Sequence, residues 1–379
     1  MIPFNHFRNV RRSSILIPTD FCGRSFKLKK IKVIFTGGTI GSRKTERNID
    51  VDVAASYELI RLYGAFTPSR QIEFDTVQPL NILSENLVPE DWLTMIKELE
   101  NIDYSLYEGI IVTHGTDTLP FTAAALSLAS QGIPIPIMLI ASNFPLNDPR
   151  GKGVLNFSHA VDFIMEQCLA GVFVIFENSQ GEAIVHLGTR LSQSDPFTDE
   201  YDSTYSAPFG VMSNHQFIHN THAINPSVAK LQSQSAPEVN NVPWSFSNEV
   251  LYLRPYPGLN YRYYDFSKSK PVAVLHDLYH SGTASTRNSD VFDASILHFL
   301  AYCQSHEVTV YIAPIKNKAG DLYASSHLLL EAGAIPLENI SVETALVKLM
   351  LAYGSFKEHS QILQFMQETS LFFEIHQTS

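Results

Sequence analysis

Apolar and polar residues follow two different patterns along this chain. Short apolar runs rich in β-branched residues occur at residues 31–35, 110–113, 135–140 and 171–176. Such runs are typical of strands buried on both faces of a parallel sheet. Between them, apolar residues recur at helical spacing over residues 54–63, 93–99, 119–131 and 156–169. Repeated β-α-β units place helices on both faces of a sheet. The expected fold class is therefore α/β, with a large doubly wound parallel-sheet N-terminal domain.

The same pattern divides the chain into four parts. Residues 31–214 carry the first alternation and form the predicted N-terminal domain. Residues 215–247, rich in Asn, Gln, Ser and Pro, predict a linker. A smaller C-terminal α/β domain is expected at 248–379, with strands near 249–253, 272–276 and 308–312 and helices at 341–353 and after 356. Residues 1–30 hold seven Arg or Lys but one acid, which predicts a basic N-terminal arm without chemistry of its own.

Composition narrows the class of partner. With 379 residues, 45% of them hydrophobic, the chain can bury a large core in two domains. A formal charge of -11 argues against nucleic acid or an anionic membrane as partner. No apolar run approaches the roughly 20 residues that span a bilayer. Cys22, Cys168 and Cys303 have no metal-like spacing and are odd in number, which indicates buried thiols in a reducing compartment. We expect a cytoplasmic protein that acts on a small molecule.

Candidate chemistry lies where two predicted strands end. The first runs into Thr36-Gly37-Gly38-Thr39, and the second into His114-Gly115-Thr116-Asp117. Ligands bind outside the carboxyl ends of strands in open α/β sheets, and glycines let the backbone approach a ligand closely. The two hydroxyl-bearing loops should therefore face one crevice. His114 and Asp117 alone are too few ligands for a metal, so we expect a structural histidine and no metal.

The two loop motifs together resemble the signatures of the bacterial-type L-asparaginase/glutaminase family. The similarity continues in Pro89-Glu90-Asp91-Trp92, Gly188-Thr189-Arg190, Arg254-Pro255-Tyr256-Pro257-Gly258 and the helix at 342–351, so it covers roughly residues 31–355. These outer segments look closer to the cytoplasmic type. The resemblance implies hydrolysis of a side-chain amide in an N-terminal domain, without metal or organic cofactor. It also implies a homodimer or homotetramer, in which a neighbour's small domain helps to close each pocket.

Catalytic roles carry over from the resemblance residue by residue. Thr39 would be the nucleophile and Thr116 the second catalytic hydroxyl. Asp117 would bind the ammonium of the substrate. Covalent amide hydrolysis needs such a hydroxyl nucleophile, a route for its proton, and donors for the developing oxyanion.

Substrate-binding roles fall on four further residues. Ser84 would bind the carboxylate of an amino-acid amide. Glu85 would bind its ammonium through a charge-assisted contact. Backbone N–H groups of the loops that contain Gly38 and Gly115 would form the oxyanion hole.

The chain departs from the family pattern at two positions. The segment 41–56 contains no tyrosine to activate the nucleophile, and Asn48 or Ile49 falls near the expected place. Gln193 stands where the family has a lysine that pairs with the second threonine. A glutamine can hydrogen-bond Thr116 but cannot act as a base. The candidates to replace the missing groups are Tyr57, Tyr201, Lys44 and Lys152.

Three functional hypotheses follow. The first, which we expect, is an asparaginase-type amidohydrolase acting on Asn, Gln or a related amide and releasing ammonia. The second is a member of altered chemistry that serves a modified amide or passes ammonia to a partner enzyme. The third is a binding protein that keeps the amino-acid clamp of Ser84, Glu85 and Asp117 without turnover.

Overall fold

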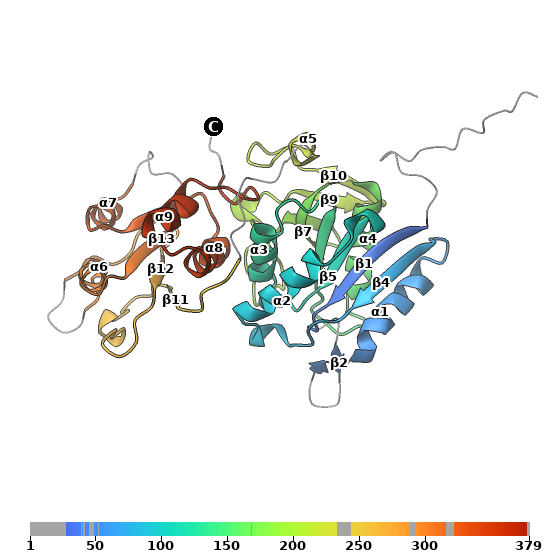
Figure 1. Cartoon of the computed structure of the whole chain (residues 1–379), viewed down its shortest axis with the longest axis horizontal. Coiled ribbons are helices and arrows are strands. Elements are labelled where there is room, and N and C mark those ends of the chain that lie inside the picture. Colours follow the sequence, from blue (N-terminus) through green and yellow to red (C-terminus); the bar gives the residue numbers. More distant parts are fainter. Residues whose placement is uncertain are drawn as a thin grey trace, which may run out of the picture.

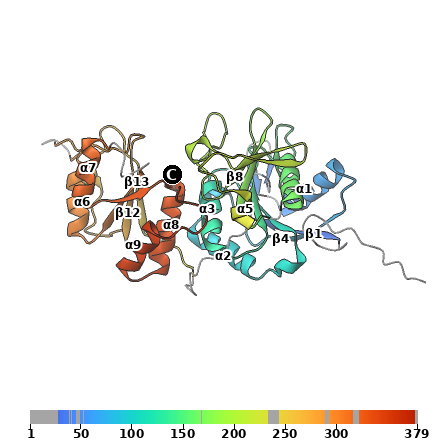
Figure 2. The same ribbon diagram turned by 90° about the horizontal axis from the view of Figure 1, so that it is seen from above.

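Two α/β units lie side by side in the structure, a large one built from the first part of the chain and a smaller one built from the last (Figures 1 and 2). The computed structural model describes residues 28–38, 40, 42–44, 49–51, 53–167, 169–232, 244–288, 293–315 and 322–376. Within the described ranges, no helix is both long and apolar enough to cross a bilayer.

The large unit is organised around an eight-stranded sheet in the order β10-β9-β8-β7-β6-β5-β1-β4. The strands β7, β6, β5, β1 and β4 are mutually parallel, whereas β8, β9 and β10 are antiparallel to their neighbours. Its strands are β1 (Lys29–Phe35), β4 (Ile72–Val77), β5 (Gly109–Thr113), β6 (Pro136–Ile140), β7 (Gly171–Glu177), β8 (Ala183–Leu187), β9 (Gly210–Ser213) and β10 (Gln216–His219). A separate antiparallel pair is formed by β2 (Ser42–Lys44) and β3 (Ile49–Val51).

Helices cover both faces of this sheet, as the doubly wound prediction requires. They are α1 (Val53–Phe66), α2 (Pro89–Glu100), α3 (Leu119–Ala129), α4 (Gly153–Glu166) and the short α5 (Val228–Gln232). Side chains of β1 alternate between the faces: Ile34 packs in the core with α2 and α3, while Val33 and Phe35 pack with α1 and α4. Every residue of β5 is buried, which explains its uninterrupted apolar sequence.

The small unit is a four-stranded parallel sheet in the order β11-β12-β13-β14. Its elements are β11 (Val250–Leu253), β12 (Ala273–Asp277), α6 (Ile296–Ser305), β13 (Thr309–Ile315), α7 (Ala324–Glu331), β14 (Ile335–Glu338), α8 (Val342–Ser355) and α9 (His359–Gln367). Helix α8 lies against α3 of the large unit, as both views show (Figures 1 and 2). The large sheet covers one side of α3, and α8 covers the other side. Ten of the eleven residues of α3 are therefore buried.

The structure refines the expected boundaries. The four strands predicted for the parallel sheet are confirmed as β1, β5, β6 and β7, whereas the parallel edge strand β4 and the three antiparallel strands were not predicted. Residues 215–247, the predicted linker, contain β10 and α5, and β10 pairs with β9 in the large sheet. Most of the predicted basic arm, together with Cys22, Cys168 and Thr39, lies outside the described residues. Cys303 is a free, buried thiol, as expected.

The end of the chain ties the two units together through a C-terminal turn, residues 369–376. Thr189 Oγ1 of the large unit donates to the carbonyl of Phe372 at 2.8 Å, and Arg190 Nε donates to the carbonyl of Phe373 at 2.9 Å. The ring of Phe372 belongs to the core beneath β7.

A fully buried ion pair holds this turn to the small unit. Lys348 of α8 and Glu374 are both 0% exposed, with Nζ 2.9 Å from Oε1. Glu374 also accepts hydrogen bonds from the backbone N–H groups of Leu371 and Phe372. Burial alone would raise the pKa of Glu374, but the Lys348 ammonium and these donors outweigh it and hold the pKa below its ordinary value. Glu374 is therefore ionised at neutral pH.

We predict that Glu374→Ala lowers the free energy of unfolding by about 3 kcal/mol, because it leaves a buried ammonium and several N–H groups unpaired. Since the folded pKa of Glu374 lies below the unfolded one, this difference is complete at neutral pH and shrinks as the pH falls through the folded pKa. Urea unfolding at a series of pH values measures it. Glu368→Ala, at the exposed end of α9, is the control; equal effects of the two substitutions would contradict the assignment.

Candidate active site

Two loops meet at the carboxyl ends of adjacent strands. Phe35 of β1 is the register partner of Thr113 of β5, so the segments that follow them leave the sheet next to each other. The buried Thr36 Oγ1 donates to the carbonyl of Thr113 at 2.7 Å and joins the two segments. Gly38 N–H then donates to the carbonyl of Ile82 at 2.9 Å, which adds a third loop to the same edge.

The loops approach so closely that only glycine fits at their contact. Gly38 has a φ of +68°, and a Cβ on it would lie 2.3 Å from the backbone nitrogen of Gly115. A Cβ on Gly115 would lie 2.4 Å from Ser84 Oγ. The predicted residues Gly38, Gly115 and Ser84 are therefore stacked against one another at the edge of the sheet.

Ser84 connects this stack to Asp117. It lies in the short 3-10 turn η2 (Ser84–Asn86), is 5% exposed, and places its Oγ 3.3 Å from Asp117 Oδ2. Thr118 Oγ1 donates to the carbonyl of Ser84 at 2.9 Å and fixes the turn to the start of α3. Asp117 and Glu85 are exposed and Thr116 is half-buried. The Ser84 hydroxyl and the Asp117 carboxylate thus lie beside the glycine contact, and Glu85 and Thr116 are their neighbours in the sequence.

His114 is part of the support beneath the site. Its Nδ1 lies 2.8 Å from the carbonyl of Gly115 and its Nε2 lies 2.9 Å from Thr122 Oγ1. Burial lowers the pKa of His114 to about 4, against the smaller opposing effects of Gly115 and Asp117, so the ring is neutral at pH 7. Among the described residues, no group of three His, Cys, Asp or Glu side chains could hold a metal ion.

Tyr201 contacts the backbone of the loop that contains Thr116. Its hydroxyl donates to the carbonyl of Thr116 at 2.6 Å, and its ring packs edge-on against Phe176 at the end of β7. Of the other proposed substitutes, Lys152 is bound to Glu177 and to the carbonyl of Asn178, and Tyr57 is 69% exposed. The side chain of Lys44 lies outside the described part of the chain.

Gln193 lies in a different environment. Its exposed side chain lines a cleft of about 710 Å³ between the two units, together with Asp277 and Glu343. Its backbone N–H donates to Glu343 Oε1 at 3.0 Å. Gln193 and Thr116 both belong to the described part of the chain, and no hydrogen bond joins their side chains. Its predicted contact with Thr116 stays a prediction.

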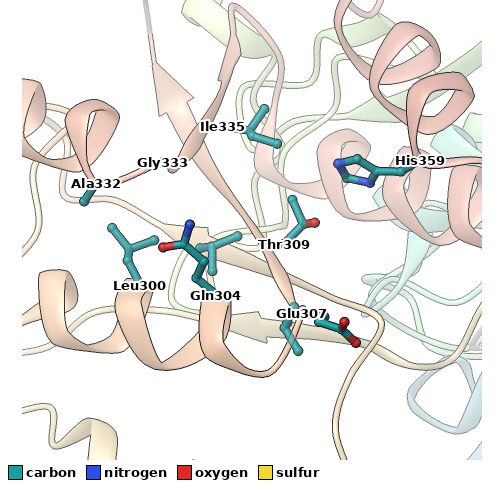
Figure 3. A pocket seen from close by; sticks show the side chains of 10 residues that line it. Leu300, Gln304, Glu307, Thr309, Ala332, Gly333, Ile335 and His359 are labelled. Atoms are coloured by element: carbon teal, nitrogen blue, oxygen red, sulfur yellow. The ribbon is translucent and has the colours of Figure 1, made fainter.

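A second hollow, of about 500 Å³, lies at the amino end of β13 in the small unit. Figure 3 shows Gln304 of α6, Thr309 of β13 and His359 of α9 around it, together with Glu307 from the turn between α6 and β13. None of the predicted site residues lines this hollow. The candidate site is thus defined by the contacts between the loops.

Comparison with known proteins identifies this arrangement. The family model described as Asparaginase, N-terminal, matches residues 30–224, more than half of the chain. The chain belongs to the asparaginase family. A curated relative, the L-asparaginase of Thermococcus kodakarensis, is 26% identical over 349 residues, covering 89% of this chain and 97% of the relative. Another relative, one of the subunits of the glutamyl-tRNA(Gln) amidotransferase of Methanococcus maripaludis, is 27% identical over 357 residues, covering 89% of this chain and 79% of the relative.

Solved structures agree on the fold of this asparaginase-family chain. The thermostable L-asparaginase from Thermococcus kodakarensis superposes with a TM-score of 0.71 at 25% identity and covers 92% of this chain and all of that one. L-asparaginase I from Vibrio cholerae gives a TM-score of 0.74 at 22% identity over 93% of this chain and all of that one, which supports the fold alone. The α/β prediction with a large and a small unit is confirmed.

Sequence reasoning missed two supporting residues of this asparaginase-family site. Thr118 belongs to the second motif but received no predicted role, although threonine is a common N-cap residue at the start of a helix. Ile82, whose backbone pairs with Gly37 and Gly38, carries no local signal, because its pairing depends on a loop 44 positions away in the sequence.

We predict that Gly38→Ala destabilises the protein more than Gly181→Ala does. Both glycines have positive φ, but a Cβ on Gly181 meets nothing within 4 Å. Gly181→Ala should therefore lower the free energy of unfolding only by the strain of a left-handed alanine, roughly 1–2 kcal/mol. Gly38→Ala adds a collision with the Gly115 backbone. Thermal unfolding of the two variants measures the difference, and equal losses would argue against the close contact.

Proposed function

We propose that this asparaginase-family protein hydrolyses the side-chain amide of asparagine, glutamine or a related amino-acid amide and releases ammonia. The observation that carries the proposal is the contact of Ser84 with Asp117 beside the Gly38–Gly115 approach. A carboxylate can bind the ammonium of an amino-acid amide, a hydroxyl can bind its carboxylate, and backbone N–H groups can bind its amide oxygen.

In the proposed reaction Thr39 Oγ attacks the carbonyl carbon of the side-chain amide. The C–N bond then breaks, the nitrogen leaves as ammonia with the proton that Thr39 gave up, and an ester to Thr39 remains. Water hydrolyses the ester to a free carboxylic acid and restores the threonine hydroxyl. Thr116 is the second catalytic hydroxyl in this proposal, and Gln193 stands at the position of the family lysine. N–H groups of the loops with Gly38 and Gly115 would bind the oxyanion.

Asp117 and Glu85 give the site its preference for a cationic group. Both carboxylates are exposed, and the Ser84 hydroxyl lies between Asp117 and the backbone of Gly115. An ammonium between two carboxylates forms charge-assisted hydrogen bonds. We therefore propose that Asp117 and Glu85 bind the α-ammonium and that Ser84 binds the α-carboxylate.

A second candidate function is donation of ammonia to another enzyme. The similarity to a component of an amidotransferase over 89% of this chain favours it. Such a protein would use glutamine strictly and would release ammonia slowly on its own, because uncoupled hydrolysis wastes the product. Slow release from glutamine alone would favour ammonia donation, whereas rapid release by the purified chain on its own would favour hydrolysis.

The setting that we propose for this activity follows from composition and resemblance. The charge of -11 favours a small-molecule substrate over nucleic acid or a membrane. We propose a cytoplasmic homodimer or homotetramer that needs no metal or organic cofactor.

We predict that the purified protein releases ammonia from asparagine or glutamine, and that Thr39→Ala and Thr116→Val each lower the rate by at least about 100-fold. Removing a nucleophile or a proton-transfer group has effects of this order or larger. A coupled ammonia assay measures the rate. Thr94→Val, in which the lost hydroxyl donates only within α2, is the control and should keep the wild-type rate.

Two results would contradict the proposal. Ammonia release that survives Thr39→Ala would place the chemistry elsewhere. No release by the wild type, together with a rise in melting temperature on addition of L-aspartate, would leave an amino-acid-binding protein with the clamp of Ser84, Glu85 and Asp117.

A further inference from the structure

The loop that follows the antiparallel strand β8 brings one tyrosine to the back of the candidate site. Backbone hydrogen bonds from Ser192 N–H to the carbonyl of Asp202 and from Asp195 N–H to the carbonyl of Glu200, both 2.9 Å long, pair the two arms of this loop. Tyr201 is therefore fixed at its base. Its side chain is 8% exposed and belongs to the core that contains α3.

The contact of Tyr201 is with a backbone group of the second motif. Its hydroxyl donates to the carbonyl of Thr116 at 2.6 Å. Because a peptide unit is planar and trans, fixing the Thr116 carbonyl also fixes the N–H of Asp117 in the opposite direction. One hydrogen bond thereby sets the orientation of the peptide that joins the two proposed site residues.

The protonation state of Tyr201 suits a donor. Burial, and then the nearby Asp117 carboxylate, raise the pKa of Tyr201 above its ordinary value. The hydroxyl is therefore protonated and neutral at neutral pH. It can donate a hydrogen bond but cannot replace the missing lysine as a base or as a charge.

We propose that Tyr201 is a positioning residue for the reaction: it holds the Thr116–Asp117 peptide from its carbonyl side. This inference rests on the proposed function, because it assigns Tyr201 to the same site. The role does not require Gln193, whose side chain lines the cleft between the units. It explains how the second loop keeps its orientation in a chain that lacks the family lysine.

Tyr201→Phe in the full chain tests the proposal, with Tyr205→Phe as the matched control. Tyr205 follows in the same segment and its hydroxyl also donates one hydrogen bond, to Asn339 Oδ1 at 2.9 Å, away from Thr116. We expect Tyr201→Phe to lower kcat for ammonia release by roughly 5- to 100-fold and to raise KM, the effect of one unpaired buried acceptor. Tyr205→Phe should keep both constants within about twofold. A merely structural role would change the melting temperature but neither constant of the folded enzyme.

A second measurement keeps this test separate from that of the proposed function. Hydrogen exchange of the peptide covering residues 114–119 should become at least about tenfold faster in Tyr201→Phe, since one tenfold change corresponds to 1.4 kcal/mol. Exchange in β6 and α4 should stay as in the wild type. If the wild type releases no ammonia but this local change is found, the proposed hydrolysis fails while the positioning contact stands. Unchanged exchange at 114–119, or unchanged kcat and KM in an active enzyme, overturns the inference.

Discussion

The close approach of two backbone segments at the edge of the large sheet is the constraint on which the site depends. Gly38 and Gly115 follow neighbouring parallel strands, and neither can carry a side chain without displacing the other loop or Ser84. The contact stacks three loops and brings Ser84 within reach of Asp117. The side chains of Asp117 and Glu85 are exposed to solvent. Their position at the site therefore depends on the backbone segments that this contact holds.

Hydrogen bonds from His114 and Tyr201 support this contact from behind. His114, neutral through burial, joins Gly115 to Thr122 of α3, and Tyr201 binds the carbonyl of Thr116. On the other side of α3, the small unit packs through α8, and the C-terminal turn with its buried Lys348–Glu374 pair closes the junction. The stability of the junction and the geometry of the site are therefore connected through α3.

Much of the fold could be predicted from the sequence, because buried parallel strands are continuous apolar runs and the helices between them have clear periodicity. The antiparallel strand β10 escaped this reasoning, since alternate residues of it are exposed and it lies in a polar stretch. The family resemblance proposed Ser84 as a site residue, but its close approach to Gly115 was not predicted, because the two residues lie 31 positions apart in the sequence. The hydrogen bond from Tyr201 to the carbonyl of Thr116 was not predicted either, because it joins residues 85 positions apart in the sequence.

The claim that this site forms a covalent intermediate on a threonine can be tested most directly by trapping the nucleophile. The protein would be incubated with an asparagine analogue whose side-chain amide is replaced by an electrophilic diazoketone, digested, and analysed by mass spectrometry. Our account predicts one adduct per chain, on Thr39, that excess L-aspartate prevents. No adduct, or an adduct on another residue that L-aspartate does not prevent, would contradict it.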